Sequence, residues 1–174
     1  MLFLLFHLDD ERYALDATQI AEVLPLADMR AIPGAPAWAA GILMHRGEPV
    51  PVIDVTRLAL GRASQRLRST RLAIVRYRPS VDGGSPAFGK PYERRLGLVV
   101  ERATQTARIA RDAFRDSAIV TSHARWLGPI ASDADGLVQW VAVSQILDGE
   151  ARTLLFDYAA SLAPSADGLT QSLP

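Results

Sequence analysis

The sequence contains no cysteine in its 174 residues, which excludes disulfide bonds, thiolate nucleophiles and cysteine metal ligands together. This absence fits a reducing compartment. An excess of charge is also missing, because 19 basic and 19 acidic side chains give a formal net charge of zero. We therefore expect no overall field that draws the chain to nucleic acid or to anionic lipid, so that any charged recognition is local.

Long apolar segments are missing as well. The apolar start of the sequence has no basic lead, lasts only to Leu8 and runs into the acidic residues Asp9, Asp10 and Glu11. A secretory signal needs a basic start, and a membrane span needs about 20 apolar residues. We predict a cytoplasmic protein with no direct membrane insertion. Its composition, 49% hydrophobic and 22% charged, is typical of one globular domain.

The apolar residues that are present fall in short runs rich in Val, Ile and Leu. These runs have the length of strands and lie at residues 2–8, 50–55, 71–77, 96–100 and 137–143. Polar residues 9–12 separate the first run from residues 13–15, which predicts a hairpin. Pro49 and Pro51 remove two backbone donors and indicate an edge strand or an irregular strand entry. The pattern predicts a mainly β fold.

Helical signals are few. Residues 17–24 carry apolar side chains at helical spacing before Pro25, which predicts a short helical turn there. The longest expected helix begins at Gln145 or Gly149. The end of the chain, residues 161–174, is dominated by small and polar residues and is expected to be a disordered tail.

Two parts of the chain share a pattern at an offset of 88 residues. The offset pairs Val50 with Val138, Ile53 with Val141 and Val55 with Val143. Apolar strands also align by chance. A duplication into two small barrels that share a core would account for the pattern, since closure of a barrel removes exposed sheet edges.

The sequence shows no complete motif for catalysis or metal binding. Residues 84–90 match the G-x-x-x-x-G-K half of a phosphate loop, but Pro91 follows where the motif needs Ser or Thr. The three histidines, His7, His45 and His123, lie far apart, and no pair has the i, i+4 spacing of a helical metal site. No serine lies in a G-x-S-x-G elbow. No cofactor or catalytic residue is expected.

Two polar segments remain. Residues 79–91, rich in Gly and Pro, are expected to form a flexible hairpin loop. Residues 57–78 contain seven arginines and no acid, but the loop at 61–70 within them lacks the interleaved aromatics that stack on bases. We interpret this loop as solvated and basic, with a docking surface for an acidic protein patch as the alternative.

A segment in the first half resembles the core signature of the CheW-like family. Residues 32–55 contain a Pro-Gly turn, Gly41, an apolar strand, Arg46-Gly47 and the strand Pro-Val-Ile-Asp, in that order. Further stretches are similar to the family in the same order, at residues 3–8, 13–16, 20–24, 96–101 and 127–130. The resemblance covers about residues 2–150.

The resemblance implies a fold and a function. The fold is mainly β, with two intertwined five-stranded, SH3-like β-barrel subdomains, short helices and a C-terminal helix, within one domain at residues 1–160. The function is that of a non-enzymatic adaptor in receptor arrays at the inner face of the membrane. Its partners are the cytoplasmic helical hairpin of a chemoreceptor and the regulatory domain of a CheA-type histidine kinase.

The resemblance also implies which residues bind partners. Arg46 and Gly47 match a position at the receptor-contacting groove, and Gly41, Ile20 and Glu22 match the same signalling surface. The residues themselves leave simpler interpretations open. Arg46 is also compatible with an ordinary hairpin arginine, Ile20 with a core residue, and Gly41 with a position that only the backbone conformation demands.

Two alternatives to this function remain. Residues 130–136 are more polar and longer than the family pattern, which leaves open a coupling protein of the Wsp-type surface-sensing branch that controls cyclic-di-GMP synthesis. The other alternative is a small-molecule or nucleotide-binding β-barrel that uses residues 84–90. Binding of RNA by residues 57–78 is the least favoured interpretation.

Overall fold

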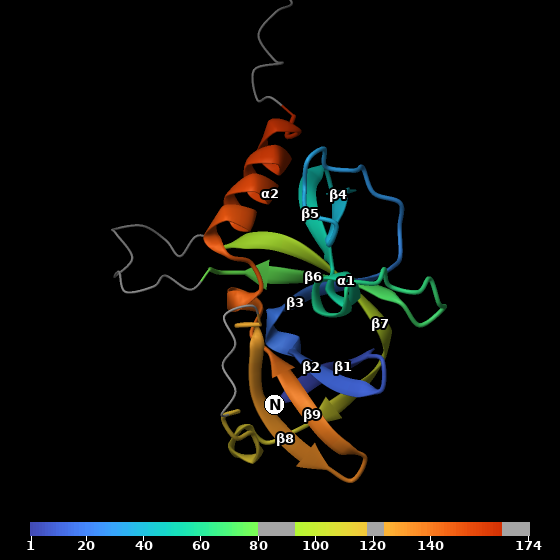
Figure 1. The fold of residues 1–174 in the computed structure, drawn as a ribbon, viewed down its shortest axis with the longest axis vertical. Coiled ribbons are helices and arrows are strands. Elements are labelled where there is room, and N and C mark those ends of the chain that lie inside the picture. The colour runs from blue at the N-terminus through green and yellow to red at the C-terminus, as the bar shows by residue number, and fades with distance from the viewer. Residues whose placement is uncertain (80–92, 118–123, 165–174) are drawn as a thin grey trace, which may run out of the picture.

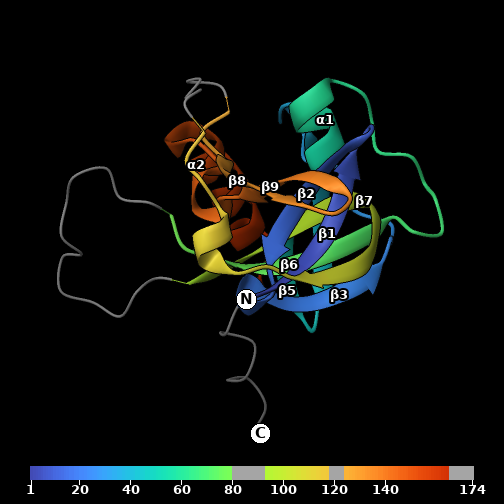
Figure 2. The same cartoon turned by 90° about the horizontal axis from the view of Figure 1, so that it is seen from below.

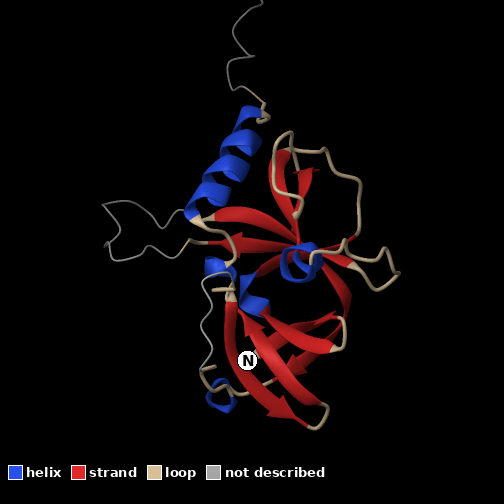
Figure 3. Cartoon of the chain, viewed as in Figure 1, coloured by secondary structure: helices blue, strands red, loops and turns tan. Residues whose placement is uncertain are grey.

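The computed structural model describes residues 1–79, 93–117 and 124–164. Most of the expected hairpin loop at 79–91, the whole of the partial phosphate-loop match at 84–90 and most of the expected tail at 161–174 lie outside these ranges. Strands dominate the described chain, as Figure 3 shows. The prediction of a mainly β fold is confirmed.

The strands form two sheets that share one long strand. The first sheet contains β3 (Ile20–Pro25), β6 (Arg71–Tyr77), the first part of β7 (Arg94–Arg108), β5 (Glu48–Asp54) and β4 (Ala39–His45), in that order. The second sheet contains the last part of β7, then β1 (Leu2–Leu8), β2 (Glu11–Asp16), β9 (Gly136–Val141) and β8 (Leu127–Asp133). We call the first sheet barrel 1 and the second sheet barrel 2. They lie one above the other in Figure 1, and β7 runs through both.

The two barrels repeat each other at the offset of 88 that the sequence suggested. The hairpin β4–β5 maps onto the hairpin β8–β9 at this offset. Hydrogen bonds repeat as well, because the Asp54 N–H donates to the Trp38 carbonyl at 2.8 Å and the Ala142 N–H donates to the Trp126 carbonyl at 2.8 Å. This repeated geometry supports the predicted duplication.

The two halves of the chain are exchanged between the barrels. The hairpin of the first half pairs with a strand of the second half, since Ile53 of β5 lies opposite Leu98 of β7 in a parallel pair. The hairpin of the second half pairs with a strand of the first half, since Gln139 of β9 lies opposite Tyr13 of β2, also in parallel. Neither barrel can therefore close without strands from both halves.

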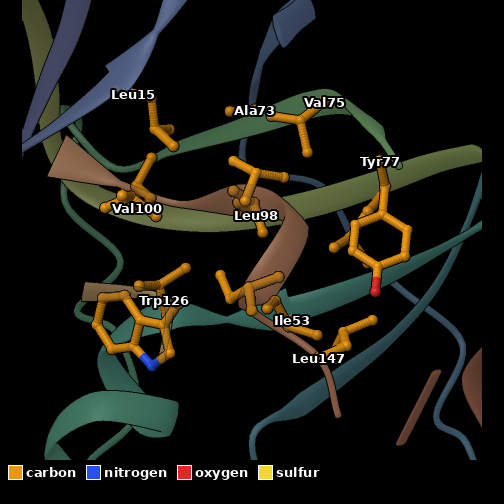
Figure 4. Packing of buried hydrophobic residues seen from close by; sticks show 14 of the residues in the cluster. Leu15, Ile53, Ala73, Val75, Tyr77, Leu98, Val100, Trp126 and Leu147 are labelled. Carbon is orange, nitrogen blue, oxygen red and sulfur yellow. The ribbon is translucent and has the colours of Figure 1, made fainter. Parts of the chain in front are cut away.

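The main core fills the space between the two barrels (Figure 4). Its buried side chains come from both barrels and include Leu15, Ile53, Ala73, Val75, Tyr77, Leu98, Val100, Trp126 and Leu147. Each large aliphatic or aromatic side chain among them contributes about 1.5–3 kcal/mol through removal of apolar surface from water. The barrels are thus joined by a common apolar cluster as well as by β7.

Helix α2 (Gly149–Ser161) closes one side of this core. Asp148 caps its first turn by accepting from the Ala151 N–H at 2.7 Å. Leu155 and Phe156 of α2 are buried, and the Phe156 ring stacks on Tyr77 with centroids 5.6 Å apart. The predicted C-terminal helix is confirmed, beginning at the later of its two expected starts.

The helical turn predicted over residues 17–24 is wrong beyond its first three residues. Residues Ala17–Gln19 form one 3-10 turn, η1, and β3 follows. Ile20 and Leu24 are four residues apart, so they share one face in a helix and in a strand alike. Pairing of β3 with β6 decides between the two, and Val23, which a helix would have buried, is 41% exposed.

Helix α1 (Val55–Leu60) was not predicted, although its boundary residues are typical. Asp54 caps it by accepting from the Arg57 N–H at 3.1 Å, and Gly61 ends it at a φ of 76°.

Pro49 and Pro51, which precede α1, lie in the part of β5 that pairs only with β4, because β7 pairs with residues 52–54. The two prolines thus lie in a part of β5 that pairs on one side, although β5 as a whole lies between β4 and β7 and is not an edge strand. Two further 3-10 turns are η2 (Arg111–Ala113) and η3 (Val143–Gln145).

Candidate functional site

The tight turn between β4 and β5 presents Arg46 at the surface. His45 and Glu48 form the last pair of the hairpin, which leaves Arg46 and Gly47 as a two-residue turn. Both turn residues have positive φ, 51° and 79°, as the mirror-image turns that match strand twist require. Glycine adopts this conformation without strain, whereas Arg46 adopts it because the hairpin register enforces it. Its side chain is 71% exposed.

Glu22 of β3 holds this turn from outside the hairpin. One oxygen, Oε2, accepts from Nη2 of Arg46 at 3.0 Å and lies 2.9 Å from Nε2 of His45 in a second hydrogen bond. The Glu22 side chain is 32% exposed and the His45 side chain only 9%. We call these three residues the Glu22 cluster. A single carboxylate thus ties a buried imidazole to an exposed guanidinium.

The structure brings together three of the five residues that the family resemblance indicates. Arg46 and Gly47 form the turn, and Glu22 contacts it. Ile20 lies two residues before Glu22 on β3, is partly buried and packs against the main core. Gly41 is buried in β4.

Gly41 is required by a close backbone approach. Its φ is 143°, and a Cβ atom there would lie 2.5 Å from the Arg30 carbonyl oxygen. Arg30 and Ile42 exchange two backbone hydrogen bonds at 2.9 and 2.7 Å, which hold the segment after β3 against β4. Any effect of Gly41 on a partner is therefore indirect, through the position of this part of barrel 1.

His45 is a member of the cluster that the sequence alone does not reveal. In the sequence it is one of three isolated histidines, yet in the structure its side chain is a partner of Glu22. The Nδ1 atom of His45 is buried and has no hydrogen-bond partner among the described residues. The one available signal is its place directly before the Arg-Gly turn, because that position ends a strand beside the turn.

The arginines of residues 57–78 do not form a continuous stripe. Arg62 pairs with Glu101 and Asp9, and Arg78 pairs with Glu93. Arg76 donates to the Thr18 carbonyl oxygen, and Arg66 lies 3.7 Å from Asp28. Most of these cations thus meet their own acceptors within the described chain. This pattern is typical of a solvated, internally paired surface and does not resemble a row of phosphate contacts.

Two carboxylates hold the loop between α1 and β6. Asp54 accepts from the N–H and the hydroxyl of Ser64, at 2.8 and 2.5 Å. Glu101, which is 3% exposed, accepts from Arg62 at 2.8 Å and from the Gln65 N–H at 2.6 Å. Burial alone would raise the pKa of Glu101, but these hydrogen bonds outweigh it and lower the pKa below the ordinary value of 4.5.

The lowered pKa of Glu101 predicts a loss of stability in acid. A carboxyl whose pKa is depressed by folding binds a proton more readily in the unfolded chain, so its contribution is present above about pH 4.5 and disappears as the pH falls through the folded-state pKa. We expect Glu101→Gln to lower the free energy of unfolding by about 3 kcal/mol at pH 7 and by less as the pH falls. Urea unfolding between pH 3 and pH 7 measures this. If the free energy of unfolding differed between the two proteins by the same amount at every pH, this expectation would be contradicted.

A surface cavity of about 440 Å³ lies beside η2 and η3. Its wall includes Phe114 and Trp140 together with Arg111 and Asp116, and it contains no residue of the Glu22 cluster. Across residues 1–79, 93–117 and 124–164, no group of three or more His, Cys, Asp or Glu side chains is placed to hold a metal ion. Within the same ranges, none of the helices combines the length and apolarity that crossing a bilayer requires.

Comparisons with known proteins agree with this architecture. The family model described as "CheW-like domain" matches residues 2–151. Over 50 residues, the chain is 38% identical to "Chemotaxis protein CheW" of Treponema pallidum (strain Nichols). These 50 residues are 29% of each protein, so the chain spans less than a third of the length of that relative. The crystal structure of scaffolding protein TtCheW from Thermoanaerobacter tengcongensis matches with a TM-score of 0.69 and 22% identity, over 86% of this chain and 89% of that one. This last likeness concerns the fold.

Proposed function

The chain belongs to the CheW-like domain family, and from this premise we propose that it is a non-enzymatic adaptor. It couples the cytoplasmic helical hairpin of a chemoreceptor to the regulatory domain of a CheA-type histidine kinase. The observation that carries the proposal is the Glu22 cluster, because it fixes an exposed arginine at the tip of a rigid hairpin. The adaptor acts at receptor arrays in the cytoplasm and needs no cofactor.

The chemistry of Arg46 suits a reversible protein contact. A guanidinium has five N–H donors in a planar fork, and Glu22 accepts from Nη2 alone. The remaining donors can bind a partner carboxylate or the carbonyl groups at the end of a helix. Because the backbone of the turn is fixed by the hairpin, little conformational entropy of the main chain is lost on binding. The arrangement favours recognition of a polar helix surface.

The structure also offers apolar contact area next to the cluster in sequence. Val23 follows Glu22 on β3 and is 41% exposed, and Met44 precedes His45 on β4 and is 56% exposed. Isolated exposed apolar residues are common on protein surfaces. Successive side chains of a strand point to opposite faces, so Val23 and Met44 lie on the other face of their strands from Glu22 and His45. They supply apolar contact area to a partner that also covers that face.

Reversal of charge at Arg46 tests this function. We expect Arg46→Glu to weaken binding of a soluble receptor hairpin about tenfold or more, because it replaces the donor with a carboxylate that repels both Glu22 and the partner's acceptors. Calorimetric titration measures the affinity, and thermal unfolding shows whether the fold is retained.

The matched control is Arg57→Glu, which makes the same charge change at an exposed position of α1. This control is expected to bind like the unmodified protein. The melting temperature of both variants should stay close to that of the parent, since both side chains are largely exposed. Equal binding by Arg46→Glu and Arg57→Glu would remove Arg46 from the interface and leave the proposal without its main support.

A further inference from the structure

Strand β7 contains an irregularity where it passes from barrel 1 to barrel 2. Its residues 94–100 pair with β6, and its residues from 101 onward pair with β1. The register changes here, because His7 lies opposite Glu101 whereas Leu5 lies opposite Gln105. Arg102, within this stretch, has a φ of 50°. A bulge of this kind bends a strand and changes its direction, and the curve of β7 between the barrels is visible in Figure 2.

The loop between α1 and β6, residues 61–70, binds this bulge on both sides. Before Arg102, the carboxylate of Glu101 accepts from the loop at Arg62 and at the Gln65 N–H. After Arg102, the N–H of Ala103 donates to the Ser69 carbonyl oxygen at 2.9 Å. The loop is part of barrel 1, since α1 and the loop together connect β5 to β6, which are both strands of this barrel.

Arg62 extends this contact to barrel 2. Its Nη1 donates to Glu101 at 2.8 Å, and its Nη2 donates to Asp9 at 2.7 Å. Asp9 lies in the turn between β1 and β2 and has a φ of 52°. One guanidinium therefore joins three parts of the molecule, namely the loop of barrel 1, the bulge of β7 and the first turn of barrel 2.

Stability alone is a poor explanation for this arrangement. An ion pair with a buried member, such as Arg62–Glu101, loses hydration and is often no more stable than an apolar pair of similar volume. The presence of such a pair is better explained by a role in selecting one conformation among several. Here the geometry in question is the angle between the two barrels, because the bulge is where β7 bends.

We propose that Arg62 is a positioning residue that fixes the relative orientation of the two barrels by holding the bulge of β7 against the turn between β1 and β2. On the basis of the proposed adaptor function, Arg62 also contributes to the coupling of receptor and kinase. An adaptor that carries a receptor and a kinase must place them at a defined angle, so coupling depends on this residue even though it touches neither partner.

The orientation can be measured in the isolated protein. Because the chain has no cysteine, Met44→Cys and Leu137→Cys provide two unique sites for spin labels, one exposed on each barrel. We expect a narrow distribution of label distances in the parent and a broader or shifted distribution in Arg62→Gln. Arg62→Lys should restore it in part, because an ammonium retains the charge but lacks the fork that reaches two carboxylates.

Two further variants complete the test. Asp9→Asn weakens only the contact with barrel 2 and changes an exposed side chain, so it tests the inference even if Arg62→Gln does not fold. Arg66→Gln, on the same loop and 70% exposed, is the matched control and should leave the distances unchanged. A distribution as narrow as that of the parent in folded Arg62→Gln or Asp9→Asn would overturn the inference.

The second readout concerns coupling. Arg62→Gln should bind an isolated receptor hairpin and an isolated kinase regulatory domain as the parent does. In the parent, a bound receptor hairpin should raise the affinity for the kinase domain, and this enhancement should fall about tenfold in Arg62→Gln. Unchanged distances together with normal binding refute the role of Arg62 and leave the adaptor function intact. If the parent protein binds neither partner, the adaptor function is refuted. The label distances then still decide whether Arg62 fixes the relative orientation of the barrels.

Discussion

Gly41→Ala is expected to lower the free energy of unfolding by about 3 kcal/mol, because two costs add at this position. A side chain at a φ of 143° is strained, and its Cβ would lie 2.5 Å from the Arg30 carbonyl oxygen and 3.0 Å from the Met29 Cβ. Neither contact involves the end of a flexible side chain, so the backbone itself must shift. Chemical denaturation with urea measures the loss.

Gly34→Ala is the matched control for this prediction. Gly34 also has a positive φ, 73°, but apart from its two chain neighbours no residue has an atom within 4 Å of the added Cβ. It should lose only the conformational cost, about 1 kcal/mol. If Gly41→Ala is no less stable than Gly34→Ala, the close approach to Arg30 is not what requires glycine. If the prediction holds, weaker partner binding by Gly41 variants is a consequence of a disturbed barrel 1.

Leu98→Ala is expected to destabilise both barrels together by about 3 kcal/mol. Leu98 is completely buried on β7 and lies opposite Ile53 of β5 and Ala73 of β6. It belongs to the core between the barrels, and the strand that carries it continues into barrel 2. A cavity at this position therefore weakens the core and the strand that the two barrels share.

Hydrogen exchange followed by mass spectrometry shows whether the loss is shared. The hairpins β4–β5 and β8–β9 are equivalent segments of the two barrels, so their exchange rates can be compared directly. In Leu98→Ala both should exchange faster by the same factor, because both open through global unfolding. Leu137→Ala, at a position 60% exposed, should change neither. Faster exchange of β4–β5 alone would show that the barrels unfold separately.

Much of this fold was predictable because the local signals are unambiguous. The run at residues 71–77 coincides with β6, and the first run coincides with β1. Pro49 and Pro51 indicated the part of β5 that pairs on one side only, because proline has no N–H to donate to a neighbouring strand. The offset of 88 residues suggested two barrels that share a core, and the resemblance to the family added their five-stranded, intertwined arrangement, which the apolar runs alone do not specify.

The remainder depends on contacts between distant parts of the chain. Residues 20–25 form a strand because β6 lies beside them, whereas their spacing fits a helix equally well. The offset of 88 predicts two similar hairpins, but it does not show that each pairs with a strand from the other half. The same limit applies to the Glu22 cluster, because Glu22 and His45 are 23 residues apart and only the closed barrel brings them into contact.

Sedimentation of vesicles that carry the receptor's cytoplasmic hairpin shows whether this protein joins a receptor to a kinase. Purified CheA-type kinase is added with the adaptor, with Arg46→Glu or with no adaptor. We expect the kinase to sediment with the vesicles when the unmodified adaptor is present and to stay in solution without it, and we expect Arg46→Glu to reduce the sedimented amount strongly. Equal amounts of kinase on the vesicles under all three conditions would contradict it.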